Sequence, residues 1–331
     1  MDQPEPQRVS TLIDTFRALR EDLSGRIIGQ AHLVDRLLVA LLADGHLLVE
    51  GAPGLAKTTA IKELASRIEA DFHRVQFTPD LLPADLTGTE IYRPQEARFE
   101  FQRGPIFHNV ILADEVNRAP AKVQSALLEA MGERQVTIGR TTYPLPNLFL
   151  VMATQNPIEQ EGTYPLPEAQ LDRFLMHVSI GYPDAESEAA ILRLARSRAR
   201  AELHAAEAPR QRLSQAQIFA AREAVLDLHL APALEQYIVE LVVATRNAQR
   251  HGADLARWIA FGASPRGTIA LDRCARAHAW LAGRDYVLPE DVHAVAPDVL
   301  RHRVLLSYEA EAEGVRGDQV IAQLLARVAL P

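Results

Sequence analysis

The chain reads Val49-Glu50-Gly51-Ala52-Pro53-Gly54-Leu55-Ala56-Lys57-Thr58-Thr59 between a short apolar strand, expected at His46–Glu50, and an amphipathic helix expected to begin near Thr58. Backbone N–H groups in such a glycine-rich turn and at a helix N-terminus attract anions, so these residues predict a phosphate-binding loop. Lys57 would reach the β- and γ-phosphates of a nucleotide, and the Thr58 hydroxyl would bind Mg²⁺. Ala56 stands where the common form of the loop has glycine, and a plain turn between two core elements is the competing interpretation.

Two adjacent carboxylates, Asp114 and Glu115, follow the apolar run Val110–Ala113 further along the chain. A short apolar run suits a strand that is buried on both faces, and ligands bind at the carboxyl end of such strands in open α/β sheets. Asp114 would hold Mg²⁺, and Glu115 would polarise the water that attacks the γ-phosphate. Alone, the pair would be a solvated strand end. Together with the loop at Lys57, it predicts a nucleotide hydrolase.

Length and composition fit a protein of two ordinary domains, because the chain has 331 residues, 48% of them apolar and 24% charged. The net charge of −8 argues against a protein whose main ligand is a nucleic-acid backbone. The single cysteine, Cys274, excludes an internal disulfide and a cysteine-rich zinc site. The N-terminus lacks a basic-then-apolar signal, and no apolar run reaches membrane-spanning length, so we expect a cytoplasmic location.

Strand and helix patterns alternate through the first half of the chain. Five strands are expected, at His46–Glu50, His73–Phe77, Val110–Ala113, Leu148–Ala153 and Leu175–Ile180. This alternation predicts an α/β fold, with an N-terminal helix over residues 1–25 and then a nucleotide-binding core over residues 26–182, whose parallel sheet is covered on both sides. Two segments interrupt it, Thr87–Phe107 and Arg134–Pro144, and we expect both to be hairpin insertions that contact something outside the core.

Strand patterns nearly vanish after Gly181-Tyr182-Pro183. Helices are expected at Glu186–Leu203, Gln215–Leu228, Ala233–Arg250, Arg266–Leu281 and Gln319–Val328, with one more beginning at Pro289. Residues 183–331 therefore predict a smaller, all-α domain.

Three polar residues outside these motifs are candidates for completing the site. Asn156 follows a buried strand and would orient the attacking water, although an Asn before proline also forms turns. Arg173 would either pair with Asp172 at the surface or reach into a neighbouring subunit, where such an arginine is worth on the order of a thousandfold in rate. Arg266 opens a helix, where the helix dipole disfavours a cation, so we expect a nucleotide phosphate held between the two domains to attract it.

These residues together resemble the ring-forming AAA+ ATPases, specifically their MoxR branch. The resemblance runs from about Ile28 to the end of the chain. It is carried by Gly51–Thr59, Leu82–Gly88, Gly104–Phe107, Asp114–Pro120 and, most specifically, Ala153–Phe174. Ala56 is usual in this branch.

The resemblance implies roles for individual residues. Asn156 would be sensor 1, Arg173 the trans-acting arginine finger and Arg266 sensor 2, with Arg118 a rival for the subunit interface. Ile28 and Gly29 would border the adenine. The hairpins would be the helix-2 insert and the pre-sensor-1 hairpin of the clade, and Gln76 would couple Glu115 to a signal from the client.

The function implied by the resemblance is ATP hydrolysis with Mg²⁺ in an oligomeric ring, expected to be a hexamer, that remodels a protein client. Loss of the γ-phosphate would free the lid domain to rotate. The resemblance further implies a partner with a von Willebrand A domain and a role in metal-cofactor insertion or enzyme maturation. Two alternatives stay open: a nucleic-acid motor, in which Arg134 and Arg140 of the second hairpin touch phosphates, and an ATP-dependent binding scaffold.

Overall fold

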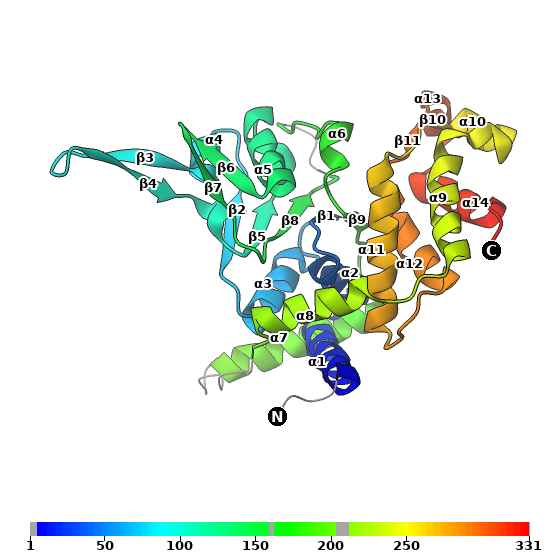
Figure 1. Cartoon of the computed structure of the whole chain (residues 1–331), viewed down its shortest axis with the longest axis horizontal. Coiled ribbons are helices and arrows are strands. Elements are labelled where there is room, and N and C mark those ends of the chain that lie inside the picture. The colour runs from blue at the N-terminus through cyan, green and yellow to red at the C-terminus, as the bar shows by residue number, and fades with distance from the viewer. Residues whose placement is uncertain (1–4, 159–161, 203–211, 331) are drawn as a thin grey trace.

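A five-stranded parallel sheet forms the centre of the N-terminal half (Figure 1). The computed structural model describes residues 5–158, 162–202 and 212–330. The strand order is β2-β5-β8-β1-β9, and every neighbouring pair is parallel. The bounds are β1 Leu47–Glu50, β2 Phe72–Gln76, β5 Val110–Asp114, β8 Leu150–Gln155 and β9 Met176–Ser179. The predicted α/β class and its five strands are confirmed, with strand ends that differ by one or two residues.

Continuous apolar runs form these strands because the sheet is covered on both faces. Val110 and Leu112 of β5 enter one cluster with α2 (Ala31–Leu42) and α3 (Lys57–Arg67), whereas Ile111 and Ala113 enter another with α5 (Ala121–Glu133). Successive side chains of a strand point to opposite faces, so a strand buried on both sides shows no polar alternation. Helix α1 (Glu5–Arg26) packs outside α2 and α3, and the short helix α4 (Pro83–Thr87) packs on α5.

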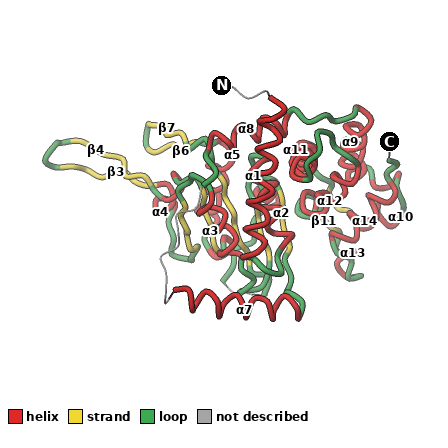
Figure 2. The backbone as a smooth tube through the Cα atoms, turned by 90° about the horizontal axis from the view of Figure 1, so that it is seen from below, coloured by secondary structure: helices red, strands yellow, loops and turns green. Residues whose placement is uncertain are grey.

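Both expected hairpins are present. Strands β3 (Gly88–Arg93) and β4 (Arg98–Arg103) form an antiparallel ribbon that projects away from the sheet, as Figures 1 and 2 show from two directions. Strands β6 (Gln135–Ile138) and β7 (Thr141–Pro144) form the second ribbon. Between these elements lie the 3-10 turns η1 (Pro105–Phe107) and η2 (Val116–Arg118), and α6 (Glu168–Leu171) follows β8.

The C-terminal half is helical, as predicted. Its helices are α7 Ala185–Glu202, α8 Gln215–Leu226, α9 Pro232–Arg246, α10 Ala253–Trp258, α11 Pro265–Leu281, α12 Pro289–Leu300, α13 Tyr308–Ala312 and α14 Gly317–Arg327. The helix expected over Ala233–Arg250 is shorter, because it ends at Arg246 and a 3-10 turn, η3 (Ala248–Arg250), follows. The end expected at Leu203 for the first helix lies outside the described residues. One short antiparallel pair, β10 (Ile259–Phe261) with β11 (Leu305–Leu306), was not predicted.

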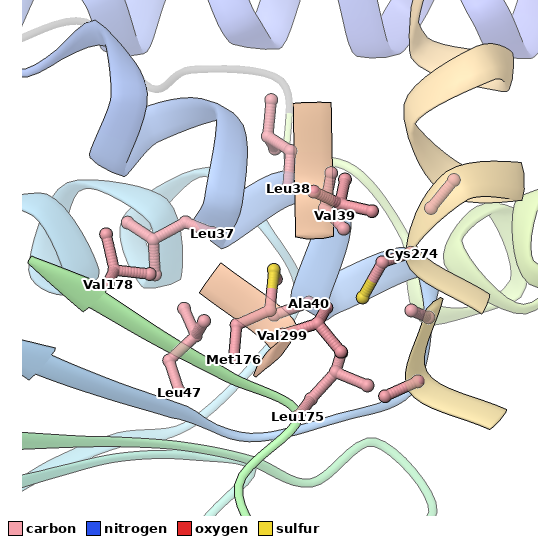
Figure 3. Close-up of a cluster of buried hydrophobic side chains, with 14 of the residues drawn as sticks. Leu37, Leu38, Val39, Ala40, Leu47, Leu175, Met176, Val178, Cys274 and Val299 are labelled. Carbon is pink, nitrogen blue, oxygen red and sulfur yellow. The ribbon is translucent and has the colours of Figure 1, made fainter. Parts of the chain in front are cut away.

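The lid helices share one apolar core with the sheet. Figure 3 shows Leu37–Ala40 of α2 between Leu47, Met176 and Val178 of the sheet and Cys274 and Val299 of the lid helices α11 and α12. Helix α8 packs against α1, α2 and α11, and its Arg222 donates to the Leu41 carbonyl (2.8 Å). The packing between the sheet and the following helices therefore continues across residue 183, where the lid was expected to begin. No helix in the described ranges is long and apolar enough to cross a membrane.

Candidate active site

The loop between β1 and α3 is built for close approach by a ligand. Gly54 and Ala56 have left-handed φ angles of 84° and 59°, and Ala56 accepts a strain of roughly 1–2 kcal/mol there. A Cβ on Gly51 would lie 2.5 Å from Cγ1 of Ile180, so only glycine fits beside β9. Helix α3 then begins at Lys57 with no capping side chain, which leaves the N–H groups of its first turn facing the loop.

Lys57 is a half-buried cation held by carbonyl groups. Its Nζ donates to the carbonyls of Gly51, Ala52 (3.3 Å) and Gln155 (3.4 Å). Burial lowers the pKa of Lys57, and the carboxylates of Asp114, Glu115 and Glu50 oppose that shift without touching Nζ. A phosphate in front of the loop would supply the contact that these carboxylates do not make.

A cavity of about 360 Å³ opens in front of the loop. It is lined by residues 53–59, Arg74, Asp114, Glu115, Thr154 and Asn156. The predicted phosphate-binding, metal-binding and water-activating residues are thus brought together at the carboxyl edge of the sheet. Thr58 and Asp114 offer oxygen ligands of the kind Mg²⁺ prefers, and Mg²⁺ on a nucleotide needs only one or two from the protein. No cluster of three or more His, Cys, Asp or Glu side chains that could hold a metal ion occurs among the described residues.

The acidic pair is positioned by three side chains that the sequence analysis did not assign to this task. The Thr154 hydroxyl donates to Oδ1 of Asp114 (2.6 Å) and accepts from the Glu115 backbone N–H (2.9 Å). Arg74 pairs with Oδ2 of Asp114 at 2.6 Å. Arg118 lies 3.0 Å from Oε2 of Glu115. The closeness of Thr154 and Arg74 to Asp114 follows from the strand order, because β8 and β2 flank β5 and the carboxyl ends of the three strands lie together.

Gln76 and Asn156 also lie at this edge. Nε2 of Gln76 donates to Oε2 of Glu115 (2.8 Å), which is the contact needed for the expected coupling between them. Asn156 is 8% exposed and accepts from the Ile158 N–H (3.1 Å), so it forms the turn and lines the cavity at the same time.

A second, more apolar cavity of about 240 Å³ adjoins the loop. It shares Gly54, Leu55, Ala56 and Thr59 with the first and adds Ile28, Gln30 and residues of α7, among them Ile191 and Leu194. Gly29 has φ 77°, and a Cβ there would lie 2.8 Å from Cβ of Pro183. An apolar slot beside a phosphate loop suits a flat base.

Arg173 and Arg266 lie away from this edge. Arg173 precedes β9, which runs parallel to β1, so it belongs to the amino edge of the sheet, roughly 13 Å of strand away from the loop. Arg266 lies near it, with Nη1 3.8 Å from Oδ2 of Asp172. Both line a third cavity of about 410 Å³, and the phosphate loop lines none of it. Lys57 and Arg266 of the same chain, which were expected to bind one nucleotide together, therefore line separate cavities.

The third cavity carries excess positive charge. It is lined by five arginines, Arg134, Arg173, Arg266, Arg273 and Arg303, and by two carboxylates, Asp44 and Asp172. Each carboxylate is already paired, Asp44 with Arg134 (2.8 Å) and Asp172 with Arg303 (2.9 Å). Arg134 is thereby engaged at the base of its hairpin. We call these lining residues the arginine cavity.

Arg173 lies in the arginine cavity against helix α5. Its Nη1 donates to the Leu128 carbonyl (3.0 Å), and a Cβ on Gly132 would lie 2.0 Å from the same nitrogen. The glycine is therefore needed for the position of Arg173, a requirement that the helical pattern of α5 does not reveal.

Comparisons with known proteins agree with this geometry. The model of the ATPase family associated with various cellular activities (AAA) matches residues 46–176, and an AAA lid domain model matches residues 253–324. The chaperone MoxR1 of Mycobacterium tuberculosis is 49% identical over 92% of this chain and 79% of its own length, and the protein MoxR of Paracoccus denitrificans is 36% identical over 91% and 92%. A solved structure from Cytophaga hutchinsonii matches with a TM-score of 0.90 and 47% identity over 98% of both chains.

Proposed function

This chain belongs to the MoxR family of AAA ATPases, and we propose that it hydrolyses ATP with Mg²⁺ in an oligomeric ring and remodels a protein client. The observation that carries the proposal is the cavity in which Lys57, Thr58, Asp114, Glu115 and Asn156 converge at the carboxyl edge of the sheet.

Each residue of the cavity has a defined task in this proposal. Lys57 and the N–H groups of the loop bind the phosphates, while Thr58 and Asp114 hold Mg²⁺, which neutralises charge on the β- and γ-phosphates. Glu115 accepts a hydrogen bond from the attacking water and takes its proton, and Asn156 orients that water. Glu115 is held by Gln76 and Arg118 before this step, so these two contacts must loosen for it to turn toward the water.

Each complete site needs two chains. The arginine cavity holds Arg173 and Arg266 at the opposite edge of the sheet from the chain's own phosphate loop, and its excess positive charge suits the γ-phosphate of a neighbour. A ring in which each arginine cavity covers the next subunit's phosphate loop supplies that arrangement, and a hexamer is the size expected from the family. Arg266 then acts in trans beside Arg173, and Arg118 stays with Glu115 of its own chain.

A protein client is proposed because relatives such as MoxR1 are named chaperones. A partner with a von Willebrand A domain, a role in metal-cofactor insertion or enzyme maturation, and action in the cytoplasm rest on the family resemblance alone. A nucleic-acid motor is less well supported, since Arg134 is paired with Asp44 and the net charge is −8.

Subunit mixing tests the proposal. Glu115→Gln disables the subunit that binds ATP, and Arg173→Ala disables its neighbour, so each variant alone should release phosphate at least about a hundredfold more slowly than the wild type. A mixture contains interfaces where both residues are native, so its rate should exceed that of either variant. Glu115→Gln with ATP should also retain a client in a pull-down. The variant should no longer activate the client if the protein is a remodelling ATPase, whereas a passive scaffold would keep its function.

Lys57→Ala is the matched control, because it disables the same side of the site as Glu115→Gln, and a mixture of those two should regain nothing. It should also abolish ATP binding in calorimetry. A wild-type protein that releases no phosphate from ATP in any oligomeric state would refute the hydrolase. Phosphate release without rescue in the Arg173→Ala mixture would refute the shared site.

A further inference from the structure

One carboxylate joins the segment that bears Arg173 to two elements of the lid. Oδ1 of Asp172 accepts from Nε of Arg303 (2.9 Å), in the turn that follows α12, and Oδ2 accepts from the Ser264 hydroxyl (2.8 Å). Ser264 caps helix α11, and its oxygen in turn accepts from the backbone N–H of Arg266 (3.1 Å). Asp172, the residue directly before Arg173, therefore contacts Arg303 through one carboxylate oxygen and the cap that precedes Arg266 through the other.

Because each active site is proposed to need two chains, we propose that Asp172 is the positioning residue that holds Arg173 and Arg266 as a fixed pair for the terminal phosphate of a nucleotide bound by a second copy of this chain. Asp172 itself is not a phosphate ligand in this inference, since its charge repels phosphate. It acts through the two arginines.

Arg303 holds the backbone around Asp172 and Arg173 against the lid. Its side chain is 2% exposed, and besides Asp172 Oδ1 it donates to the carbonyls of Asp172 (3.2 Å), Phe174 (2.6 Å) and Leu175 (3.1 Å). Burial lowers the pKa of Arg303, and the Asp172 carboxylate opposes that shift. The backbone on both sides of Arg173 is thus held from the lid, while α5 holds the side chain at the Leu128 carbonyl.

The two arginines come from separate elements, so their spacing depends on how the lid is docked. With Asp172 in place this spacing is fixed before a neighbour arrives, and donors fixed in advance stabilise developing charge without reorganising during the reaction. Without Asp172 the Ser264 hydroxyl loses its acceptor, and the start of α11 is free to shift relative to Arg173.

The test extends subunit mixing to Asp172→Asn in the full-length protein. Alone, Asp172→Asn should lower kcat for ATP by about tenfold to a hundredfold, less than Arg173→Ala, with KM within about twofold. Mixed with Glu115→Gln it should regain activity, because some interfaces then combine a native phosphate loop with a native arginine cavity. Mixed with Arg173→Ala it should regain none, because both changes damage the same side of the site. A variant that only damaged the structure would not regain activity with Glu115→Gln and yet fail to regain it with Arg173→Ala.

Two controls keep the test decisive. Asp254→Asn breaks a comparable pair with Arg327 (2.6 Å) at the far end of the lid and should leave kcat unchanged. If Asp172→Asn fails to fold, Ser264→Ala keeps the Asp172–Arg303 pair and should show the same mixing pattern with a several-fold loss of kcat. Its control is Ser307→Ala, which removes the cap of α13.

Wild-type kcat in Asp172→Asn, or recovery when it is mixed with Arg173→Ala, would overturn the positioning role. So would a lack of recovery with Glu115→Gln while Arg173→Ala and Glu115→Gln still rescue each other. Failure of that last pair would instead count against the shared site itself, so the two failures are distinguishable.

Discussion

At the scale of single residues, Thr154 explains how two adjacent carboxylates take different positions. Its hydroxyl donates to Asp114 and accepts from the N–H of Glu115, whose left-handed φ of 56° turns the chain away from the strand. Thr154 is 1% exposed, so its hydroxyl makes both bonds out of contact with solvent. Asp114 is thereby kept at the sheet edge while Glu115 extends into the cavity.

Thr154→Val keeps the shape of the side chain and removes the hydroxyl. Because a buried donor and a buried carboxylate oxygen then lack partners, we expect the free energy of unfolding to fall by about 1–3 kcal/mol and kcat for ATP to fall with it. Urea unfolding and phosphate release measure the two quantities. Thr154→Ser keeps the hydroxyl and should stay close to the wild type in kcat. Equal kcat values for the valine and serine variants would show that the hydroxyl does not position the acidic pair.

The residues found from the sequence were those whose task is local to one motif. Asp114 ends β5, Asn156 follows β8, and Lys57 and Thr58 begin the helix after the β1 loop. The carboxyl ends of parallel strands meet at one edge, so the meeting of these residues was predictable. The cavity that Arg266 lines could not be predicted, because the position of Arg266 depends on where the lid docks. No local pattern reports on that docking.

At the scale of elements, a buried ion pair fastens the lid helix α12 to the core helix α2. Asp298 of α12 accepts from Nε of Arg36 (2.6 Å), and His32 and Arg301 lie within 3.1 Å of its carboxylate. Burial raises the pKa of Asp298, but His32 and Arg36 outweigh this effect and hold the pKa at about 2, below the ordinary 3.8. Both Arg36 and Asp298 are nearly inaccessible to solvent.

The depressed pKa makes this joint sensitive to acid. A carboxyl whose pKa is lower in the folded state stabilises the fold above its unfolded pKa, and this contribution is lost as pH falls from about 4 to about 2. It amounts to about 2 kcal/mol. Asp298→Asn should therefore be less stable than the wild type by at least this amount at pH 7, and the difference should shrink below pH 4.

Urea unfolding of both proteins, from pH 7 down to the lowest pH at which the wild type still unfolds cooperatively, measures this difference. Asp318→Asn is the control, because Asp318 is half exposed where it pairs with Arg301 and should contribute little. A difference between Asp298→Asn and the wild type that stays constant through the acid range would mean that Asp298 does not titrate as inferred.

Elements with strong local patterns were the ones that the sequence predicted. The buried runs gave the five strands, and alternating residues gave both hairpins. The β10–β11 pair was missed because three residues against two carry no detectable period. The Arg36–Asp298 ion pair connects residues that lie far apart in the chain, so only the folded structure reveals it.

At the scale of the whole molecule, the lid is part of the body that carries the sheet. Helix α2 packs on β9 and α11, α12 packs on β9, and the Asp172 and Asp298 contacts close the same boundary. The expected rotation of the lid against its own core would have to break this packing. We therefore propose that a motion driven by ATP hydrolysis would take place at the boundaries between subunits, where the arginine cavity of one chain would meet the phosphate loop of the next.

If the sites lie at those boundaries, bound ATP must favour assembly. A ligand that binds only the assembled state stabilises it by about 2.7 kcal/mol per site at a hundred times its Kd. Glu115→Gln should bind ATP without hydrolysing it, so ATP should shift its mass toward about 220 kDa, six times 36.6 kDa. Adding Arg266→Ala to that variant should raise the protein concentration needed for assembly by about tenfold, because a trans phosphate contact is lost. Sedimentation over a range of protein concentrations measures both effects.

Lys57→Ala, which lacks the nucleotide contact, should show no response to ATP. If ATP leaves the mass of Glu115→Gln unchanged, or if Arg266→Ala assembles as readily as its parent, then the nucleotide is not shared between chains and the arginine cavity must serve a different anion.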